Sequence, residues 1–173
     1  IRYLNHHPPG EAVARALSEL LVNDRDLLGI DANERSITFR FAMYLQRYFP
    51  DWTVIVNTTG MALAEEARTS GAVAGQEDDE AKTVFPDVIV HRRGTRNNYL
   101  VLEFKKSTSR VDRQIDLRKL RGYKQQLGYA HALFVEVGTE GQAIITMLEW
   151  AETKQGKLMT RIPPFSSQHL EAA

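Results

Sequence analysis

Three residues have types and spacing that could do chemistry: Asp87, Glu103 and Lys105. Side chains alternate faces along a strand, so Glu103 and Lys105 would project from the same face. Residues 85–91 and 99–105 are rich in β-branched and apolar side chains and flank a turn-rich segment, which predicts a hairpin. If this hairpin is symmetric about its turn, Asp87 lies directly across from Glu103. Two carboxylates would then converge beside one lysine.

This set of groups predicts a particular reaction. Two carboxylates a few ångströms apart repel each other, and burying them in a sheet is costly unless a cation neutralises them. Hard oxygen ligands, in a chain without cysteine, suit Mg²⁺ or Mn²⁺. The lysine could lower the pKa of an attacking water or stabilise negative charge that builds on a phosphate. The chemistry indicated is metal-dependent hydrolysis of a phosphodiester.

The two halves of this pattern resemble a known motif. Residues 85–88 read Phe-Pro-Asp-Val and residues 102–105 read Leu-Glu-Phe-Lys. This resembles the PD-(D/E)xK motif of the restriction-endonuclease-like nucleases. The resemblance covers residues 33–137 approximately, and it implies a hairpin that carries both halves, followed by a helix and a further strand. The pattern of apolar residues predicts the same elements in the same order.

The resemblance implies a role for each residue. Asp87 and Glu103 would bind the metal, the backbone carbonyl of Phe104 would join them, and Lys105 would act on the water. Members of the family often add a glutamate from the helix before the sheet, and Glu34 is the candidate here. We therefore expect Glu34 to be a fourth catalytic residue and a metal ligand.

Glu34 has two interpretations. It precedes Ile37 by three residues and Phe41 by seven, so it falls on the buried face of its helix, where an unpaired carboxylate is unfavourable. A metal site would explain that position. Alternatively, Asp31 and Glu34 form a capping box, in which the glutamate only satisfies backbone donors at the start of the helix.

Basic side chains suggest where nucleic acid would bind. Residues 105–124 contain eight basic and two acidic residues, an excess that could follow a phosphate backbone or could simply be a solvated helix face. Lys119 could contact phosphate or only pair with Asp116 three residues earlier on the same helix. The candidates for nucleic-acid contact are Lys106, Arg110, Arg113, Lys119, Arg92 and Arg93.

Apolar periodicity predicts a mixed α/β domain that spans residues 1–173. We expect a restriction-endonuclease-like core, with a mixed central sheet of four to five strands flanked by helices. An N-terminal helical segment (1–30), an acidic insertion (60–83) and a polar tail (153–173) would be additions to this core. The predicted helices are 11–28, 33–49 and 112–129, and the predicted strands are 53–57, 85–91, 99–105, 131–137 and 142–149.

Composition narrows the function classes. The 173 residues include no cysteine, which excludes disulfides and cysteine nucleophiles and favours a cytoplasmic protein. No apolar run approaches a membrane span, and the net charge of zero does not by itself indicate a nucleic-acid partner. We expect a Mg²⁺- or Mn²⁺-dependent endo- or exonuclease that acts on DNA. The alternatives are a non-catalytic nucleic-acid-binding or interaction module of the same fold, and a dimeric enzyme similar to Holliday-junction resolvases.

Overall fold

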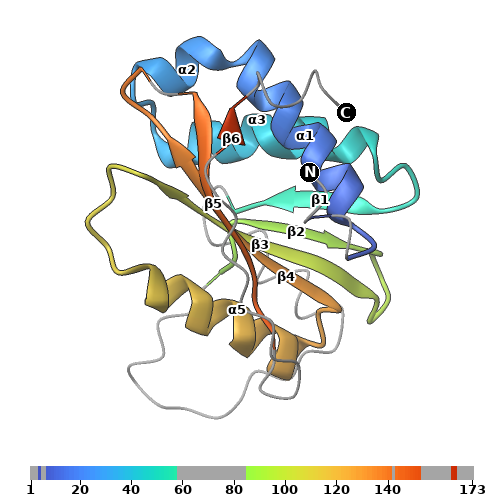
Figure 1. The fold of residues 1–173 in the computed structure, drawn as a ribbon. Helices are drawn as coiled ribbons and strands as arrows, with labels where there is room; N and C mark the ends of the chain where they lie inside the picture. Colours follow the sequence, from blue (N-terminus) through green and yellow to red (C-terminus); the bar gives the residue numbers. More distant parts are fainter. Residues whose placement is uncertain (1–3, 5–6, 58–84, 142, 153–164, 167–173) are drawn as a thin grey trace.

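In a computed structural model, which describes residues 4, 7–57, 85–141, 143–152 and 165–166, an open mixed sheet lies between two helical layers (Figure 1). Helices α1, α2 and α3 lie on one side of the sheet, and α5 covers the other. The helices are α1 (Gly10–Asn23), α2 (Arg25–Gly29), α3 (Glu34–Arg47) and α5 (Arg113–Leu127). The strands are β1 (Thr53–Val56), β2 (Val88–His91), β3 (Asn98–Lys106), β4 (His131–Gly138), β5 (Ile144–Trp150) and β6 (Phe165–Ser166).

The strands follow one another across the sheet in chain order, β1-β2-β3-β4-β5-β6. Four of the neighbouring pairs are antiparallel, whereas β3 and β4 are parallel. Parallel neighbours need a long crossover connection, and α5 supplies it. The predicted class, a mixed α/β sheet flanked by helices, is therefore confirmed. The two-residue strand β6 lies in the segment that the sequence predicts to be a polar tail.

The central strand β3 is buried on both faces, as its apolar run predicts. Leu102 and Phe104 face the core formed with α1 and α3, where the Phe104 ring lies 4.8 Å from that of Phe41. Val101 faces the second core, which α5 covers. By strand alternation, Glu103 and Lys105 share the α5 face with Val101. The layer of α5 therefore encloses the charged part of β3.

Two details of the helices differ from the sequence prediction. The predicted first helix is two helices, because the chain breaks at Asp24, whose carboxylate accepts hydrogen bonds from Arg40 Nε (2.8 Å) and Tyr44 Oη (2.6 Å) of α3. In α5, apolar spacing in the sequence predicts that Ile115 points inward with Leu120, Tyr123 and Leu127, but Ile115 is 38% exposed, while Leu117 is buried. The buried stripe of α5 is thus rotated toward Asp116 and Leu117.

The predicted acidic insertion, residues 60–83, lies outside the described residues. Among the helices that are described, none combines the length and hydrophobicity that a membrane crossing requires.

Candidate active site

The register of the β2–β3 hairpin brings Asp87 to the end of β3. Val88 is paired with Leu102, which is the register predicted for a hairpin that is symmetric about its turn. One residue further, Asp87 falls opposite Glu103, and its Oδ2 accepts a hydrogen bond of 2.8 Å from the backbone N–H of Phe104. The predicted meeting of Asp87 and Glu103 across the hairpin is therefore present.

Glu103 is almost fully buried, at 3% exposure, beneath α5. Its Oε1 accepts a hydrogen bond of 3.2 Å from the hydroxyl of Tyr123, and its Oε2 lies 3.5 Å from Nζ of Lys119. Both partners come from α5, one turn apart, so this helix carries the groups that stabilise the ionised form of Glu103.

Lys105 lies on the same face and is also buried. Its Nζ is 2.9 Å from Oδ2 of Asp116, whose other oxygen, Oδ1, lies 2.8 Å from Nζ of Lys119. Asp116 is only 1% exposed, so the pair of Asp116 and Lys119 is not the exposed surface pair that the sequence allowed. Asp116 instead connects the two lysines next to Glu103.

Glu34 reaches the same end of β3 from the start of α3. Its Oε2 accepts a hydrogen bond of 3.0 Å from the backbone N–H of Lys106. The capping box with Asp31 is not formed, because the helix is capped by Asn33, whose side chain accepts from the N–H of Arg35. The Glu34 carboxylate therefore faces the sheet, where its charge contributes to the environment of Asp87.

The two carboxylates on the hairpin resist ionisation. Burial raises the pKa of Asp87 to about 6, and the negative charge of Glu34 adds to the effect, although the Phe104 N–H opposes it. Burial and the neighbouring Asp87 raise the pKa of Glu103 well above its ordinary value. Asp87, Glu103 and Asp116 face the ammonium groups of Lys105 and Lys119, and Glu34 adds a fourth carboxylate. Carboxyl groups therefore outnumber ammonium groups at the site, a condition that favours binding of a cation.

Within the described ranges, no group of three or more His, Cys, Asp or Glu side chains is arranged to hold a metal ion. The donor chemistry nevertheless suits a hard divalent cation, because Asp87 and Glu103 are neighbouring carboxyl groups whose pKa values burial raises, and oxygen donors of this kind are the ligands such cations prefer.

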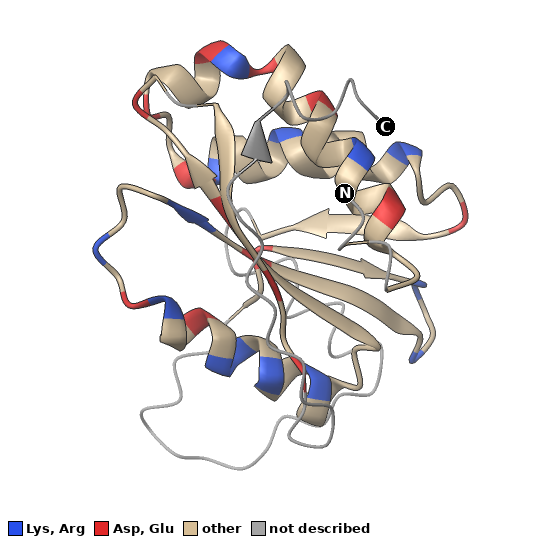
Figure 2. Ribbon diagram, viewed as in Figure 1, with Lys and Arg blue, Asp and Glu red and all other residues tan. Residues whose placement is uncertain are grey.

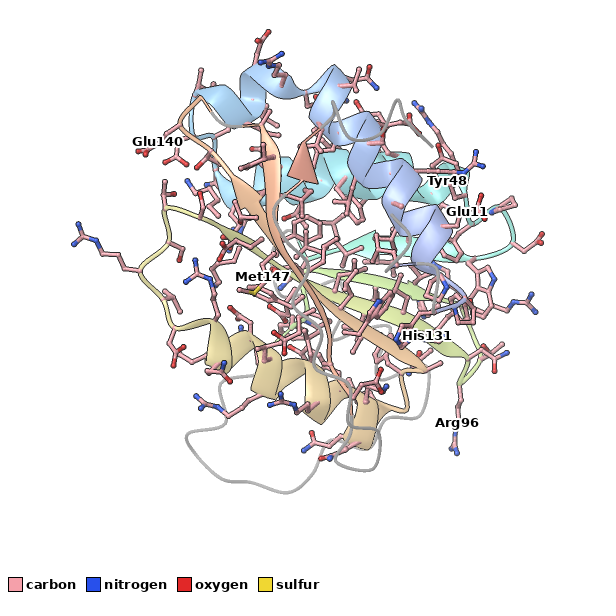
Figure 3. The ribbon with its side chains drawn as sticks, in the orientation of Figure 1. Glu11, Tyr48, Arg96, His131, Glu140 and Met147 are labelled. Carbon is pink, nitrogen blue, oxygen red and sulfur yellow. The ribbon has the colours of Figure 1, made fainter. Side chains whose placement is uncertain are left out.

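The six residues predicted to contact nucleic acid do not form one surface. The ammonium group of Lys106 forms an ion pair with Asp31, and that of Lys119 forms one with Asp116. Arg92 and Arg93 lie in the hairpin turn, at the opposite end of the strands from Asp87, and the Arg92 guanidinium lies 4.8 Å from the Trp52 ring centroid. Figure 3 labels Arg96 of the same turn.

The remaining two predicted contacts, Arg110 and Arg113, lie in the loop before α5 and in its first turn. Arg110 is exposed, and Arg113 is paired with Glu136 of β4. Figure 2 shows that basic residues continue along α5 from this loop.

Sequence reasoning missed the functions of Asp116, Tyr123 and Glu136 in this network. Asp116, Lys119 and Tyr123 recur at spacings of three and four residues and so share a helical stripe, but this spacing does not show that the stripe lies over Glu103. Glu136 interrupts the apolar run of β4, and a charge inside such a strand is a usable signal of a buried ion pair.

No family model, curated protein or solved structure matches this chain.

Proposed function

We propose that this protein is a metal-dependent nuclease that hydrolyses phosphodiester bonds of DNA and has a restriction-endonuclease-like core. One observation carries the proposal: Asp87 and Glu103 lie side by side across the hairpin, with raised pKa values and with Lys105 on the same face of the sheet. A buried pair of carboxylates that resists ionisation is destabilising in itself, so its presence favours a role in binding or catalysis.

Each residue then has a task. Asp87 and Glu103 are the metal ligands, with the carbonyl of Phe104 as a third protein ligand and Glu34 at the margin of the site. With Mg²⁺ or Mn²⁺ bound there, the ion supplies Lewis-acid activation of water and neutralises charge on the phosphate. The ammonium group of Lys105, which lies beside Asp116, stabilises negative charge that develops on the phosphate oxygens.

A second candidate function is supported by the contacts of Glu103. Lys119 and Tyr123 already contact both of its oxygens, so the carboxylate is partly satisfied by the protein itself. A non-catalytic nucleic-acid-binding module with the same fold would keep these contacts and bind no metal. Metal binding therefore separates the two functions.

The test is incubation of the protein with Mg²⁺, Mn²⁺ or EDTA, against linear, supercoiled, single-stranded and branched DNA and against RNA. Hydrolysis of DNA should require the ion and should fall at least about 100-fold in Asp87→Asn and in Lys105→Ala. Asp51→Asn is the matched control, because Asp51 is exposed and precedes β1, away from the site.

Calorimetric titration of Mn²⁺ into the protein and into Asp87→Asn completes the test. Binding that the substitution abolishes supports the proposal. Cleavage that persists in both site variants would overturn it, and absence of both metal binding and hydrolysis would favour the non-catalytic module.

A further inference from the structure

A cavity of about 530 Å³ opens beside the candidate site, between the start of α5 and strand β5. Arg110, Arg113 and Gln114 line it from the loop and the first turn of α5, and Glu149 lines it from β5. Apolar contacts come from Leu117 and from Met147, which faces the α5 layer (Figure 3). Its volume lies within the range of small-molecule sites, and its lining combines two arginines, an amide and apolar groups with the carboxylates of Asp112 and Glu149.

Glu136 of β4 holds the Arg113 side chain in place. Its Nε donates to Glu136, which is 5% exposed, and Glu136 Oε1 accepts a further hydrogen bond of 2.7 Å from the hydroxyl of Thr146. A buried carboxylate is costly, and an apolar residue would pack β4 against α5 at lower cost. The arrangement fixes a guanidinium, which retains N–H donors in a planar fork suited to phosphate.

This cavity adjoins the catalytic groups. In the parallel ladder of β3 and β4, Glu136 is the register partner of Lys105. The backbones of these two residues therefore lie roughly 5 Å apart, the spacing of neighbouring strands. Arg113 also lies one turn before Asp116, which holds Lys105. A nucleic-acid strand with one phosphate at Lys105 would thus carry its neighbouring nucleotide toward Arg113.

We propose that the cavity is a subsite for the nucleotide adjacent to the phosphodiester that is cut. This inference rests on the proposed nuclease function and adds where the substrate strand runs. Arg110 and Arg113 bind the phosphate of that nucleotide, and Leu117 and Met147 contact its base. Gln114 and Glu149 offer hydrogen-bond partners to the base edge.

The other predicted basic contacts fit this subsite less well. Lys106 and Lys119 are engaged by carboxylates. Arg92 and Arg93 line a separate cavity of about 460 Å³ at the hairpin turn, at the far end of β3 from Lys105.

The proposal is tested by binding and by two substrates of different size. Binding of a short fluorescein-labelled single strand of DNA is measured by anisotropy in the cleavage-deficient Asp87→Asn background, without a divalent ion. Arg110→Ala removes one phosphate contact, and Arg113→Lys keeps the charge beside Glu136 while removing the planar fork. Arg15→Ala, an exposed arginine on α1 in the opposite helical layer, is the control for loss of one charge.

Hydrolysis by the otherwise unmodified protein is measured on DNA and on bis(p-nitrophenyl) phosphate, a diester with no flanking nucleotide. We expect Arg110→Ala and Arg113→Lys each to weaken DNA binding about tenfold and to raise KM for DNA. In Arg110→Ala the slope of binding against salt should fall by about 0.7, the value for one phosphate contact on a single strand. Rates on the small diester should fall less than rates on DNA, because this substrate does not occupy the subsite.

If Arg110→Ala and Arg113→Lys bind DNA as tightly as Arg15→Ala does, the subsite proposal is overturned, even if the protein cleaves DNA. A protein that binds no DNA would overturn it as well. Equal rate losses on both substrates would also contradict it, because they would place the arginines in the chemical step. Failure of the unsubstituted protein to hydrolyse either substrate counts against the nuclease function alone, since the binding comparison does not need cleavage.

Discussion

Nζ of Lys105 lies 2.9 Å from Oδ2 of Asp116, and this contact joins the central strand β3 to helix α5. The other oxygen of Asp116 contacts Lys119, whose ammonium also approaches Glu103. One buried carboxylate therefore determines where both cations of the site lie. Asp116 contacts no reacting group in the proposed mechanism, so it is a positioning residue rather than a catalytic one.

Replacing Asp116 with asparagine should weaken both the fold and the reaction. The change keeps the shape of the side chain but leaves the ammonium of Lys105 buried without its counter-ion, which should lower the free energy of unfolding by about 3 kcal/mol. Cleavage of DNA should fall about 10- to 100-fold, the usual effect of removing a group that orients a catalytic residue. Urea unfolding and single-turnover cleavage measure the two effects. The exposed Asp51→Asn should change neither, and unchanged stability in Asp116→Asn would show that the contact with Lys105 is not formed in solution.

The raised pKa of Asp87 predicts an unusual dependence of stability on pH. The folded protein holds this proton up to about pH 6, whereas the unfolded chain releases it near the ordinary value of 3.8. The folded state thus binds more protons in this interval, and its stability falls as pH rises from 4 through 6. The loss attributable to Asp87 is about 2 to 3 kcal/mol without a divalent ion, and Glu103 acts in the same direction at higher pH.

The titration of His131 changes stability with pH in the opposite direction, so a variant is needed to isolate the contribution of Asp87. Burial lowers the pKa of His131 to about 4, and stability contributed by its neutral form is lost as pH falls below about 6.5. The difference in unfolding free energy between the protein and Asp87→Asn, measured from pH 4 to 8, cancels the His131 contribution. The unfolding free energy of the protein relative to that of Asp87→Asn should fall as pH rises through 6. Mn²⁺ should restore it. A difference that does not vary with pH would contradict the raised pKa.

The layer opposite the site can be tested with two phenylalanines of α3. Phe41 is fully buried and lies against Phe104, whereas Phe39, two residues earlier on the same helix, is 49% exposed. Phe41→Ala should lower the free energy of unfolding by about 3 to 5 kcal/mol, because it leaves a cavity next to β3. Phe39→Ala should cost less than about 1 kcal/mol by the same urea titration. Equal costs would mean that α3 does not pack on the sheet as described.

The charged part of the hairpin was predictable from local rules. Strand alternation and a symmetric turn were sufficient to put Asp87 opposite Glu103 and Lys105 on the same face, because side chains alternate along a strand and the turn fixes which residues pair across a hairpin. The break at Asp24 was not predictable, since it depends on Arg40 and Tyr44, which lie about one helix further along the chain. Local propensity continues the first helix through Asp24, and the tertiary contacts override it.

The α5 side of the site was only partly predictable. Helical spacing showed that Asp116, Lys119 and Tyr123 share a stripe, but spacing cannot tell which stripe faces the sheet when the helix also offers Ile115 and Leu117. The crossover that returns the chain to β4 parallel to β3 places α5 over this face of the sheet, and its buried residues include Asp116, Leu117 and Tyr123. A charged stripe that looks solvated in sequence is thereby buried against Glu103.

Tyr123 offers the most selective test of the network around Glu103. Its hydroxyl donates to Glu103 Oε1 and lowers the pKa of that carboxyl, while burial raises the pKa of the tyrosine and keeps it protonated. Tyr123→Phe should therefore raise the pKa of Glu103 further, and the acidic limb of the pH–rate profile for DNA cleavage should move to higher pH. Tyr48→Phe is a matched control, because it removes the same atom from a hydrogen bond of 2.6 Å to Glu19 between α3 and α1. Each substitution should cost about 1 kcal/mol of stability, but only the change at Tyr123 should move the profile. An identical displacement in both variants, or in neither, would place Tyr123 outside the catalytic network.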